Sequence, residues 1–317
     1  MFIGIDHGTT AIRFSSGDRE FKISRKNARD FAYRDLECLC PIGRIEGIAL
    51  GYSMGDNFSE ITPIALLSNR GVVSQAGAGE HVGGGTRVFD EILGSGLPAI
   101  AIPGLHRGSP TDPRFRAYSH QASPEKIGIA YEVHHSVGDD FVVSDVSSNT
   151  VSILVTGGRI TGAIDACIFA PGTTQGAIDV DAIRRIDRGQ MTANRAFMQA
   201  GVDFTMPRGG RTRTLALFSA MECAALRVLS PDARIALAGT CAPDIAREVA
   251  DVVLEKDNLD TLIIAIRDGR TTYINIKKSV HFFLSTNLSE IMLTGAALTV
   301  GLGSPLAAMQ LLWINLI

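Results

Sequence analysis

Two short acidic turns, far apart in the sequence, combine the residue types that hold metal-bound phosphates. They are Asp6-His7-Gly8-Thr9-Thr10 and Asp145-Val146-Ser147-Ser148-Asn149-Thr150, each at the end of an apolar run. In a tight turn of small polar residues, N–H groups and hydroxyls can converge on phosphate oxygens, while a strand-end carboxylate holds hydrated Mg²⁺. We predict that Asp6 and Asp145 are catalytic carboxylates that bind Mg²⁺ through water, on turns that face each other across a cleft.

A third candidate for phosphate binding is the glycine-rich segment Gly83-Gly84-Gly85-Thr86. It precedes a predicted helix, where free N–H groups and the helix dipole favour an anion. A substrate or γ-phosphate contact and a flexible interdomain turn both fit this segment. No G-x-x-x-x-G-K-[ST] run occurs, so a P-loop is excluded. The predicted phosphate contacts are Gly8, Thr9, Thr10, Ser147, Ser148, Asn149, Thr150, Gly84, Gly85 and Thr86.

Repeated strands must position the two acidic turns. Strand-like runs separated by HGT and SGD turns predict a β-meander over residues 2–5, 11–15 and 20–24. The runs FVVSDVSS, TVSILVTGGR and ITGAIDACIF repeat this order of strands and turns, which implies two similar α/β halves. The other expected elements are buried strands over 97–104 and 233–239 and helices over 87–93, 124–133 and 214–229.

Composition narrows the function classes. The 317 residues carry a net charge of −3 and no long run of like charges, which argues against a nucleic-acid partner. The five cysteines are scattered without a C-x-x-C pair, which predicts reduced thiols rather than a disulfide framework or a zinc site. The start MFIGIDHGTT lacks the features of a signal peptide, so we expect a cytoplasmic location for residues 1–247.

Other polar residues are candidate ligands or bases. Histidines 81, 106, 120, 134 and 135 match no standard zinc spacing, so surface or hydrogen-bonding roles are favoured. Asp56, Asp112 and Arg114 lie in polar loops that could face a cleft and supply a catalytic base. The sequence does not decide among them.

The motif GIDHGTT resembles the first phosphate motif of the superfamily of sugar kinases, actin and heat-shock-chaperone ATPases. DVSSNT would be the second phosphate motif, and IALAGT the adenosine motif, with Gly239 and Thr240 close to the nucleotide. GIDHGTTAIRF, YSMGD, GAGEHVGGGTRVFDEI, PGLHRG and SHQASPEK together look like the archaeal family called methanogenesis marker protein 12. The resemblance covers about 1–247 and implies duplicated ribonuclease-H-like (actin-like ATPase) α/β domains, over 1–138 and 139–247, that bind ATP and Mg²⁺.

The character of the sequence changes near residue 248. Residues 281–317 contain one acidic residue, Glu290, and no Lys or Arg, and 282–302 are long enough for a transmembrane helix. The motifs ADVVL, NIKK, STNLSE and LWINL resemble the end of a P-type cation-transporting ATPase. This resemblance implies a helical membrane-type segment over 248–317, in which Asn287, Glu290 and Asn315 are remnants of a cation site.

The P-type phosphorylation motifs D-K-T-G, T-G-E-S and G-D-G-x-N-D are absent from the sequence, so this segment cannot pump alone. Three hypotheses follow: a Mg²⁺-dependent ATPase or phosphotransferase of unknown acceptor, a nucleotide-binding regulatory module, and a cation-transport fragment fused to a non-catalytic scaffold. The tail implies a membrane or missing partner helices, and a homodimer is compatible with the sequence. A native fusion and an in-frame joining artefact both fit this change of character.

Overall fold

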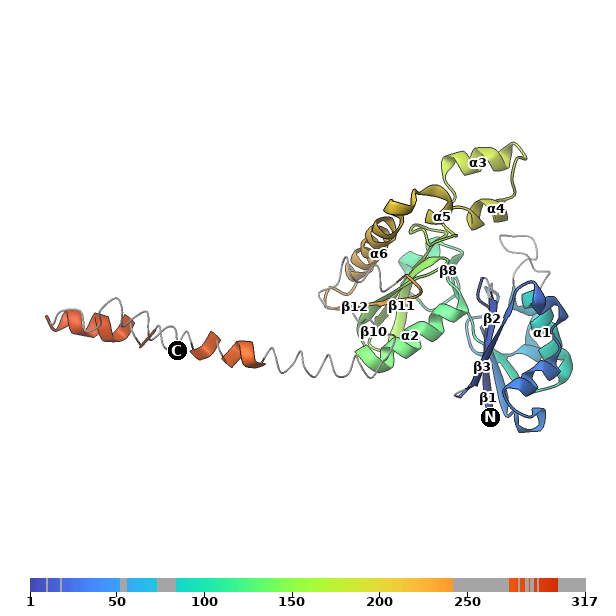
Figure 1. The fold of residues 1–317 in the computed structure, drawn as a ribbon, viewed down its shortest axis with the longest axis horizontal. Helices are drawn as coiled ribbons and strands as arrows, with labels where there is room; N and C mark the ends of the chain where they lie inside the picture. The colour runs from blue at the N-terminus through green and yellow to red at the C-terminus, as the bar shows by residue number, and fades with distance from the viewer. Residues whose placement is uncertain are drawn as a thin grey trace. The chain divides into compact units, whose positions relative to one another are not determined.

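The fold is described from a computed structural model. The described residues are 1–9, 11–17, 19–51, 56–72, 84–241, 274–278, 280–282, 285, 288–289 and 291–301. The chain divides into two compact units, Met1–Val253 and Leu254–Ile317. All strands of the described residues lie in the first unit (Figure 1).

The first sheet of this unit has the strand order β3-β2-β1-β4-β6-β5. β1 pairs antiparallel with β2 and parallel with β4, and β2 pairs antiparallel with β3. This arrangement confirms the predicted N-terminal meander. The strands are β1 (Phe2–Asp6), β2 (Ala11–Ser16), β3 (Arg19–Ser24), β4 (Gly47–Gly51), β5 (Thr62–Pro63) and β6 (Ala99–Ala101).

The second sheet repeats the arrangement, with the order β11-β10-β9-β12. β9 pairs antiparallel with β10 and parallel with β12, as β1 does with β2 and β4. A separate pair joins β7 (Leu105–His106) and β8 (His120–Ala122). The strands of the second sheet are β9 (Phe141–Val146), β10 (Thr150–Thr156), β11 (Arg159–Asp165) and β12 (Arg234–Ala238).

Six α-helices and several 3₁₀ helices connect these strands within the described part of the first unit. The α-helices are α1 (Gly84–Ser95), α2 (Pro124–Val137), α3 (Val180–Asp187), α4 (Ala193–Met198), α5 (Val202–Thr205) and α6 (Arg211–Arg227). The 3₁₀ helices are Asn27–Asp30, Tyr33–Cys38, Ile42–Arg44, Ile64–Leu66, Ser68–Gly71, Pro113–Ala117 and Arg208–Gly210.

Alternation along β9 explains how the second sheet is covered on both faces. Side chains of a strand point alternately to opposite faces, and every residue of β9 is buried. Phe141 and Val143 pack with Ala130 of α2, whereas Val142 packs with Cys223 of α6. Helices α2 and α6 therefore lie on opposite faces, an arrangement typical of a central strand that is buried on both faces.

A buried polar network lies between α6 and the second sheet. Ser152 Oγ donates to Glu222 Oε2 over 2.7 Å and lies 2.9 Å from Ser144 Oγ. The Ala170 N–H donates to Glu222 Oε1 over 3.2 Å. Burial raises the pKa of Glu222 to about 8, although its hydrogen bonds with Ser152 and Ala170 oppose the shift.

Two sequence-based expectations for this unit were wrong. Residues 233–239 were expected to be a buried strand, but Arg234 and Ile235 of β12 are exposed, since β12 ends the described part of its sheet. The segment 83–86 was expected to be a loop before a helix. Gly84, Gly85 and Thr86 instead lie in the first turn of α1. Val88, Phe89 and Ile92 of this helix pack in the hydrophobic core that includes residues of the first sheet.

The second unit is described only in short helical stretches. Residues 291–299 are helical, and Ile291, Met292 and Leu293 are exposed. Among the described residues, no helix has both the length and the apolar character needed to cross a membrane. The transmembrane helix predicted over 282–302, part of which lies outside the described residues, is therefore not supported.

Candidate functional site

The first acidic turn leaves β1 at Asp6, next to Arg13 of β2. Asp6 and Arg13 are register partners in the antiparallel pair, and Arg13 Nη1 donates to Asp6 Oδ2 over 3.1 Å. The other carboxylate oxygen, Asp6 Oδ1, is buried without a hydrogen-bond partner. A buried oxygen without a partner destabilises the folded state unless a ligand pairs with it. Thr10, the last predicted contact of this turn, lies outside the described residues.

His7 connects this turn to the glycine-rich start of α1. Its Nδ1 donates to the Gly51 carbonyl over 3.0 Å, and its ring also hydrogen-bonds with the backbone of Gly85. Arg25 Nε donates to the Gly8 carbonyl over 2.9 Å. Burial, aided by the Arg25 charge, lowers the pKa of His7 to about 4, so the imidazole is neutral. The predicted residues Gly8 and Gly85 therefore belong to one local structure.

The second acidic turn leaves β9 and is clasped by a later segment. Asp145 Oδ2 accepts a hydrogen bond from Ser147 Oγ over 3.2 Å. The Thr173 N–H donates to the Ser147 carbonyl, and the Gln175 N–H donates to the Ser148 carbonyl, both over 2.9 Å. Residues 171–176 thus form a strap over the turn.

A glycine allows the strap to lie directly on the turn. A Cβ added to Gly172 would lie 2.3 Å from the Asn149 Cα, which is closer than two carbon atoms can approach. Thr150 Oγ1 donates to the Pro171 carbonyl over 2.7 Å, and its side chain is fully buried. In this conformation the hydroxyl of Thr150, predicted as a phosphate contact, instead holds the strap.

The two turns contact each other through hydroxyl groups. Ser148 Oγ donates to Thr9 Oγ1 over 3.2 Å, and Gln175 Nε2 donates to the same oxygen over 3.4 Å. The sequence predicted that the turns face each other, but it gave no indication of Gln175. Its amide makes the strap a third contributor to the site.

Gly239 closes the second turn from the end of β12. Its φ is +97°, and an added Cβ would lie 2.3 Å from Asp145 Oδ1 and 2.5 Å from the Val146 carbonyl oxygen. Only glycine combines this backbone conformation with so close an approach. Thr240 is exposed. The adenosine motif inferred from the sequence therefore lies against the predicted Mg²⁺ carboxylate.

The start of α2 supplies two ionisable side chains that the sequence analysis missed. Ser123 Oγ donates to Glu125 Oε1 over 2.5 Å, while Glu125 Oε2 is buried without a hydrogen-bond partner. Lys126 Nζ, also buried, donates to Asp145 Oδ2. A Cβ added to Gly51 would lie 3.8 Å from the Glu125 nitrogen, so the first turn of α2 abuts the end of β4.

Electrostatic effects link these groups to the first turn. Burial raises the pKa of Glu125, and the charge of Asp6 adds to the shift. For Lys126, burial favours the neutral amine, but the charges of Asp145 and Glu125 outweigh it, and its pKa is raised. Asp6, Glu125, Lys126 and Asp145 thus form an ionisable cluster at the ends of β1 and β9.

A histidine and an aspartate extend the cluster. His120 Nε2 lies 3.3 Å from Asp165 Oδ2. Burial opposes the charged imidazole, but the hydrogen bond and charge of Asp165 prevail and raise the pKa of His120. The charge of Asp56 also reaches His120, whereas Asp112 is paired with the adjacent Arg114 over 2.7 Å. His120 is thus a hydrogen-bonding histidine, as its spacing in the sequence favoured.

The cluster fits a hydrated divalent cation. Asp6 Oδ1 and Glu125 Oε2 are buried oxygen atoms without partners, and carboxylate oxygens are the ligands that Mg²⁺ prefers. In the described part of the chain, no three His, Cys, Asp or Glu side chains converge as a direct ligand set. Mg²⁺ commonly retains several waters and uses one or two carboxylates, so water-mediated binding by Asp6 suits these residues, whereas Asp145 Oδ2 already accepts from Lys126 and Ser147.

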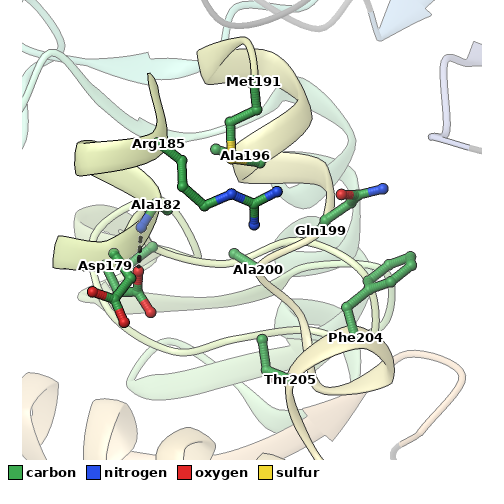
Figure 2. A pocket seen from close by; sticks show the side chains of 11 residues that line it. Asp179, Ala182, Arg185, Met191, Ala196, Gln199, Ala200, Phe204 and Thr205 are labelled. Carbon is green, nitrogen blue, oxygen red and sulfur yellow. Dashed lines mark hydrogen bonds between the residues drawn. The ribbon is translucent and has the colours of Figure 1, made fainter. Parts of the chain in front are cut away.

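A cavity of about 390 Å³ lies apart from the predicted site residues, none of which lines it. It is formed by α3, α4, α5 and their connections, and Figure 2 shows the Arg185 side chain extending across it toward Gln199. The Ala182 N–H donates to Asp179 Oδ1 over 2.8 Å, which caps α3 at one edge of the cavity. None of these helices was predicted from the sequence.

The predicted remnants of a cation site cannot be placed. Asn287, Glu290 and Asn315 lie outside the described residues. Their cation-binding role stays a prediction.

Sequence comparison identifies relatives in methanogens. A UPF0285 protein of Methanosarcina mazei is 46% identical over 255 residues, which cover 72% of this chain and 78% of that protein. A UPF0285 protein of Methanococcus aeolicus is 41% identical over 285 residues, which cover 80% of this chain and 87% of that protein. No protein-family model matches the chain. The relatives confirm the predicted link to methanogens.

Structure comparison identifies kinases of the same fold. Acetate kinase from Entamoeba histolytica has a TM-score of 0.54 at 8% identity, covering 79% of this chain and 85% of that structure. A propionate kinase from Francisella tularensis has a TM-score of 0.53 at 10% identity, covering 78% and 85%. At such low identity the likeness shows the fold, which is the actin-like ATPase fold predicted from the sequence. None of these proteins is a P-type ATPase, so the resemblance of the C-terminal segment is not supported.

Proposed function

We propose that this chain, which belongs to the UPF0285 family of methanogen proteins, is a Mg²⁺-dependent ATP-binding phosphotransferase or ATPase. The observation that carries the proposal is the direct contact between the two acidic turns, through Ser148 and Thr9. Phosphoryl transfer requires mainly positioning and charge stabilisation. Two polar turns that meet at strand ends can provide both.

Asp6 and Asp145 would hold Mg²⁺ through water, and the ion would neutralise charge on the phosphate oxygens. The hydroxyls of Thr9 and Ser148 would orient those oxygens, and the hydrogen bond between them, from one acidic turn to the other, supports this role. Gly239 keeps the end of β12 close enough to Asp145 for a nucleotide to lie along it.

Glu125 is the proposed base. Its Oε2 is buried and without a partner, and its raised pKa makes the carboxylate a better proton acceptor than an ordinary glutamate. A hydroxyl acceptor or water would give its proton to this oxygen. A carboxylate acceptor would need no base.

The acceptor class can be approached through the neighbours in fold. Both are named as kinases of short carboxylic acids, acetate and propionate. Short carboxylates are therefore the first acceptors to test, with water as the alternative that defines an ATPase.

The test is turnover of Mg·ATP by the full chain, with acetate, propionate or no added acceptor. We expect ADP formation that Asp6→Asn abolishes while nucleotide binding is retained. The matched control is Asp35→Asn, which changes an exposed aspartate on a different element. Binding without any turnover would instead favour the regulatory module, and equal turnover by Asp6→Asn would contradict the assigned role of Asp6.

A further inference from the structure

Lys126 stands out because it is a buried cation bonded to a carboxylate that Mg²⁺ would need. Its side chain is 7% exposed, that of Asp145 is 6% exposed, and Nζ donates to Asp145 Oδ2. A lysine is almost never fully buried unless it is paired. The pair therefore calls for an explanation beyond general stability.

The bond between Lys126 and Asp145 conflicts with a metal at the same carboxylate. Lys126 Nζ and Ser147 Oγ both donate to Asp145 Oδ2, and Gly239 packs against Oδ1. A hydrated Mg²⁺ would have to hydrogen-bond through its waters to oxygen atoms that the protein already occupies. Two cations beside one buried carboxylate also repel each other strongly.

The surroundings of Lys126 suggest how the conflict is resolved. The neighbouring carboxylates Glu125 and Asp165 act electrostatically on Lys126, in addition to Asp145. A lysine has a flexible four-carbon stem and three donors, so its ammonium can exchange one oxygen partner for another. The two acidic turns that would hold the phosphates meet through Ser148 and Thr9, and the second turn begins at Asp145, the present partner of Lys126.

We propose that Lys126 is an exchangeable counter-ion: it neutralises Asp145 while the site holds no nucleotide and moves its ammonium to phosphate oxygens when Mg²⁺ and nucleotide enter together. The inference rests on the proposed function, since it requires a metal-bound phosphate at this site. It makes Lys126 a gate against Mg²⁺ alone, because the metal reaches Asp145 only with a phosphate that accepts the displaced ammonium.

A fixed structural pair gives a different expectation. A buried ion pair can be replaced by apolar side chains with little loss of stability, whereas removing one partner leaves an uncompensated charge. A purely structural Lys126 would thus affect stability and would have no specific relation to metal binding. An exchangeable Lys126 affects metal and nucleotide binding in opposite directions.

The experiment measures Mn²⁺ binding, by electron paramagnetic resonance, to the full chain without nucleotide. We expect weak binding to the wild type and binding at least about tenfold tighter to Lys126→Met, because a competing unit charge has been removed from beside Asp145. Mg·ATP should show the reverse, with affinity at least about tenfold lower in Lys126→Met, because a phosphate-binding cation is lost.

Three further variants serve as controls. Lys22→Met removes an exposed lysine on β3 and should leave both affinities unchanged. Lys126→Arg keeps a cation beside Asp145 and should keep Mn²⁺ binding weak. Lys126→Met combined with Asp145→Asn should lose the Mn²⁺ binding gained by the single variant. If the single variant does not fold, Mn²⁺ binding to the nucleotide-free wild type still tests the gate.

The outcomes separate this inference from the proposed function. Failure of the wild type to bind Mg·ATP would remove the proposed function, and with it the exchange. Tight Mn²⁺ binding to the nucleotide-free wild type would overturn the gate even if Mg·ATP binds well. Loss of both affinities in folded Lys126→Met would also overturn it, in favour of a structural pair.

Discussion

Ser148 Oγ donates a hydrogen bond to Thr9 Oγ1 over 3.2 Å, although the two residues are 139 positions apart. Each residue follows an aspartate at the end of a strand whose neighbours are antiparallel on one side and parallel on the other. The bond therefore joins equivalent points of a repeated structure. It is the reason for treating the two turns as halves of one phosphate site.

The first prediction concerns this hydroxyl pair. Ser148→Ala removes one proposed phosphate contact, and we expect a several-fold loss of Mg·ATP affinity, with a change in the free energy of unfolding of about 1 kcal/mol, the size of one hydrogen bond. Ser136→Ala, on an exposed position of α2, is the matched control. Unchanged affinity in titration calorimetry of Ser148→Ala would count against a phosphate role for this turn.

The second prediction concerns the contact between Gly239 and Asp145. Gly239→Ala forces a side chain into a φ of +97° and against Asp145 Oδ1. We expect destabilisation by about 1–3 kcal/mol together with loss of nucleotide binding. Gly43→Ala, where an added Cβ meets nothing within 4 Å, should do neither. Thermal melts and nucleotide titrations of the two variants provide the comparison.

The third prediction concerns the proposed base. Glu125→Gln should lower turnover with a hydroxyl acceptor or water by about 100-fold or more, the usual contribution of a general base. Because the pKa of Glu125 is raised, the wild-type rate should increase with pH to a midpoint above that of an ordinary glutamate, and this limb should vanish in the variant. A pH profile of kcat/KM that keeps the limb in Glu125→Gln would assign it to another group.

The fourth prediction concerns the buried carboxyl behind the second sheet. The pKa of Glu222 rises from 4.5 to about 8 in the folded protein. Between these pH values the folded state keeps the proton and the unfolded state has released it, so the free energy of unfolding falls as pH rises, by on the order of 5 kcal/mol in all. Glu222→Gln, which stays neutral, should flatten this dependence and raise the Tm at pH 8 more than at pH 5.

The strands and turns of the site were predictable because they depend on local pattern. Alternation and small polar turns identified both meanders, including the strand that ends at Asp6 and the strand that carries Asp145 near its end. The opposition of the turns followed from the repeat. These features need only neighbouring residues and a rule about how equivalent halves combine.

The ionisable cluster was missed because the fold, not the local sequence, brings it together. Glu125 and Lys126 looked like the ordinary first turn of an amphipathic helix, and only the placement of that turn at the end of β4 joins them to Asp6 and Asp145. The strap residue Gln175 was missed for the same reason, because its amide contacts Thr9, which lies 166 positions away in the sequence. The available signal was the segment SHQASPEK, which carries part of the family resemblance and contains both residues.

Errors in the expected elements also have physical causes. The glycines at the start of α1 have low helix propensity, but burial of Val88, Phe89 and Ile92 against the first sheet outweighs it. The apolar run over 233–239 reads as a buried strand, yet Ile235 is 50% exposed at the end of the described sheet. In both cases tertiary position overrides the local pattern.

Titration calorimetry of the full, folded chain with Mg·ATP shows whether the two acidic turns form a nucleotide site. We expect saturable binding with a Kd below about 1 mM, weakened by Ser148→Ala and by Gly239→Ala but not by Gly43→Ala. Absence of any binding at concentrations well above that value, in a protein shown by circular dichroism to be folded, would contradict the assignment of the two turns as a nucleotide site.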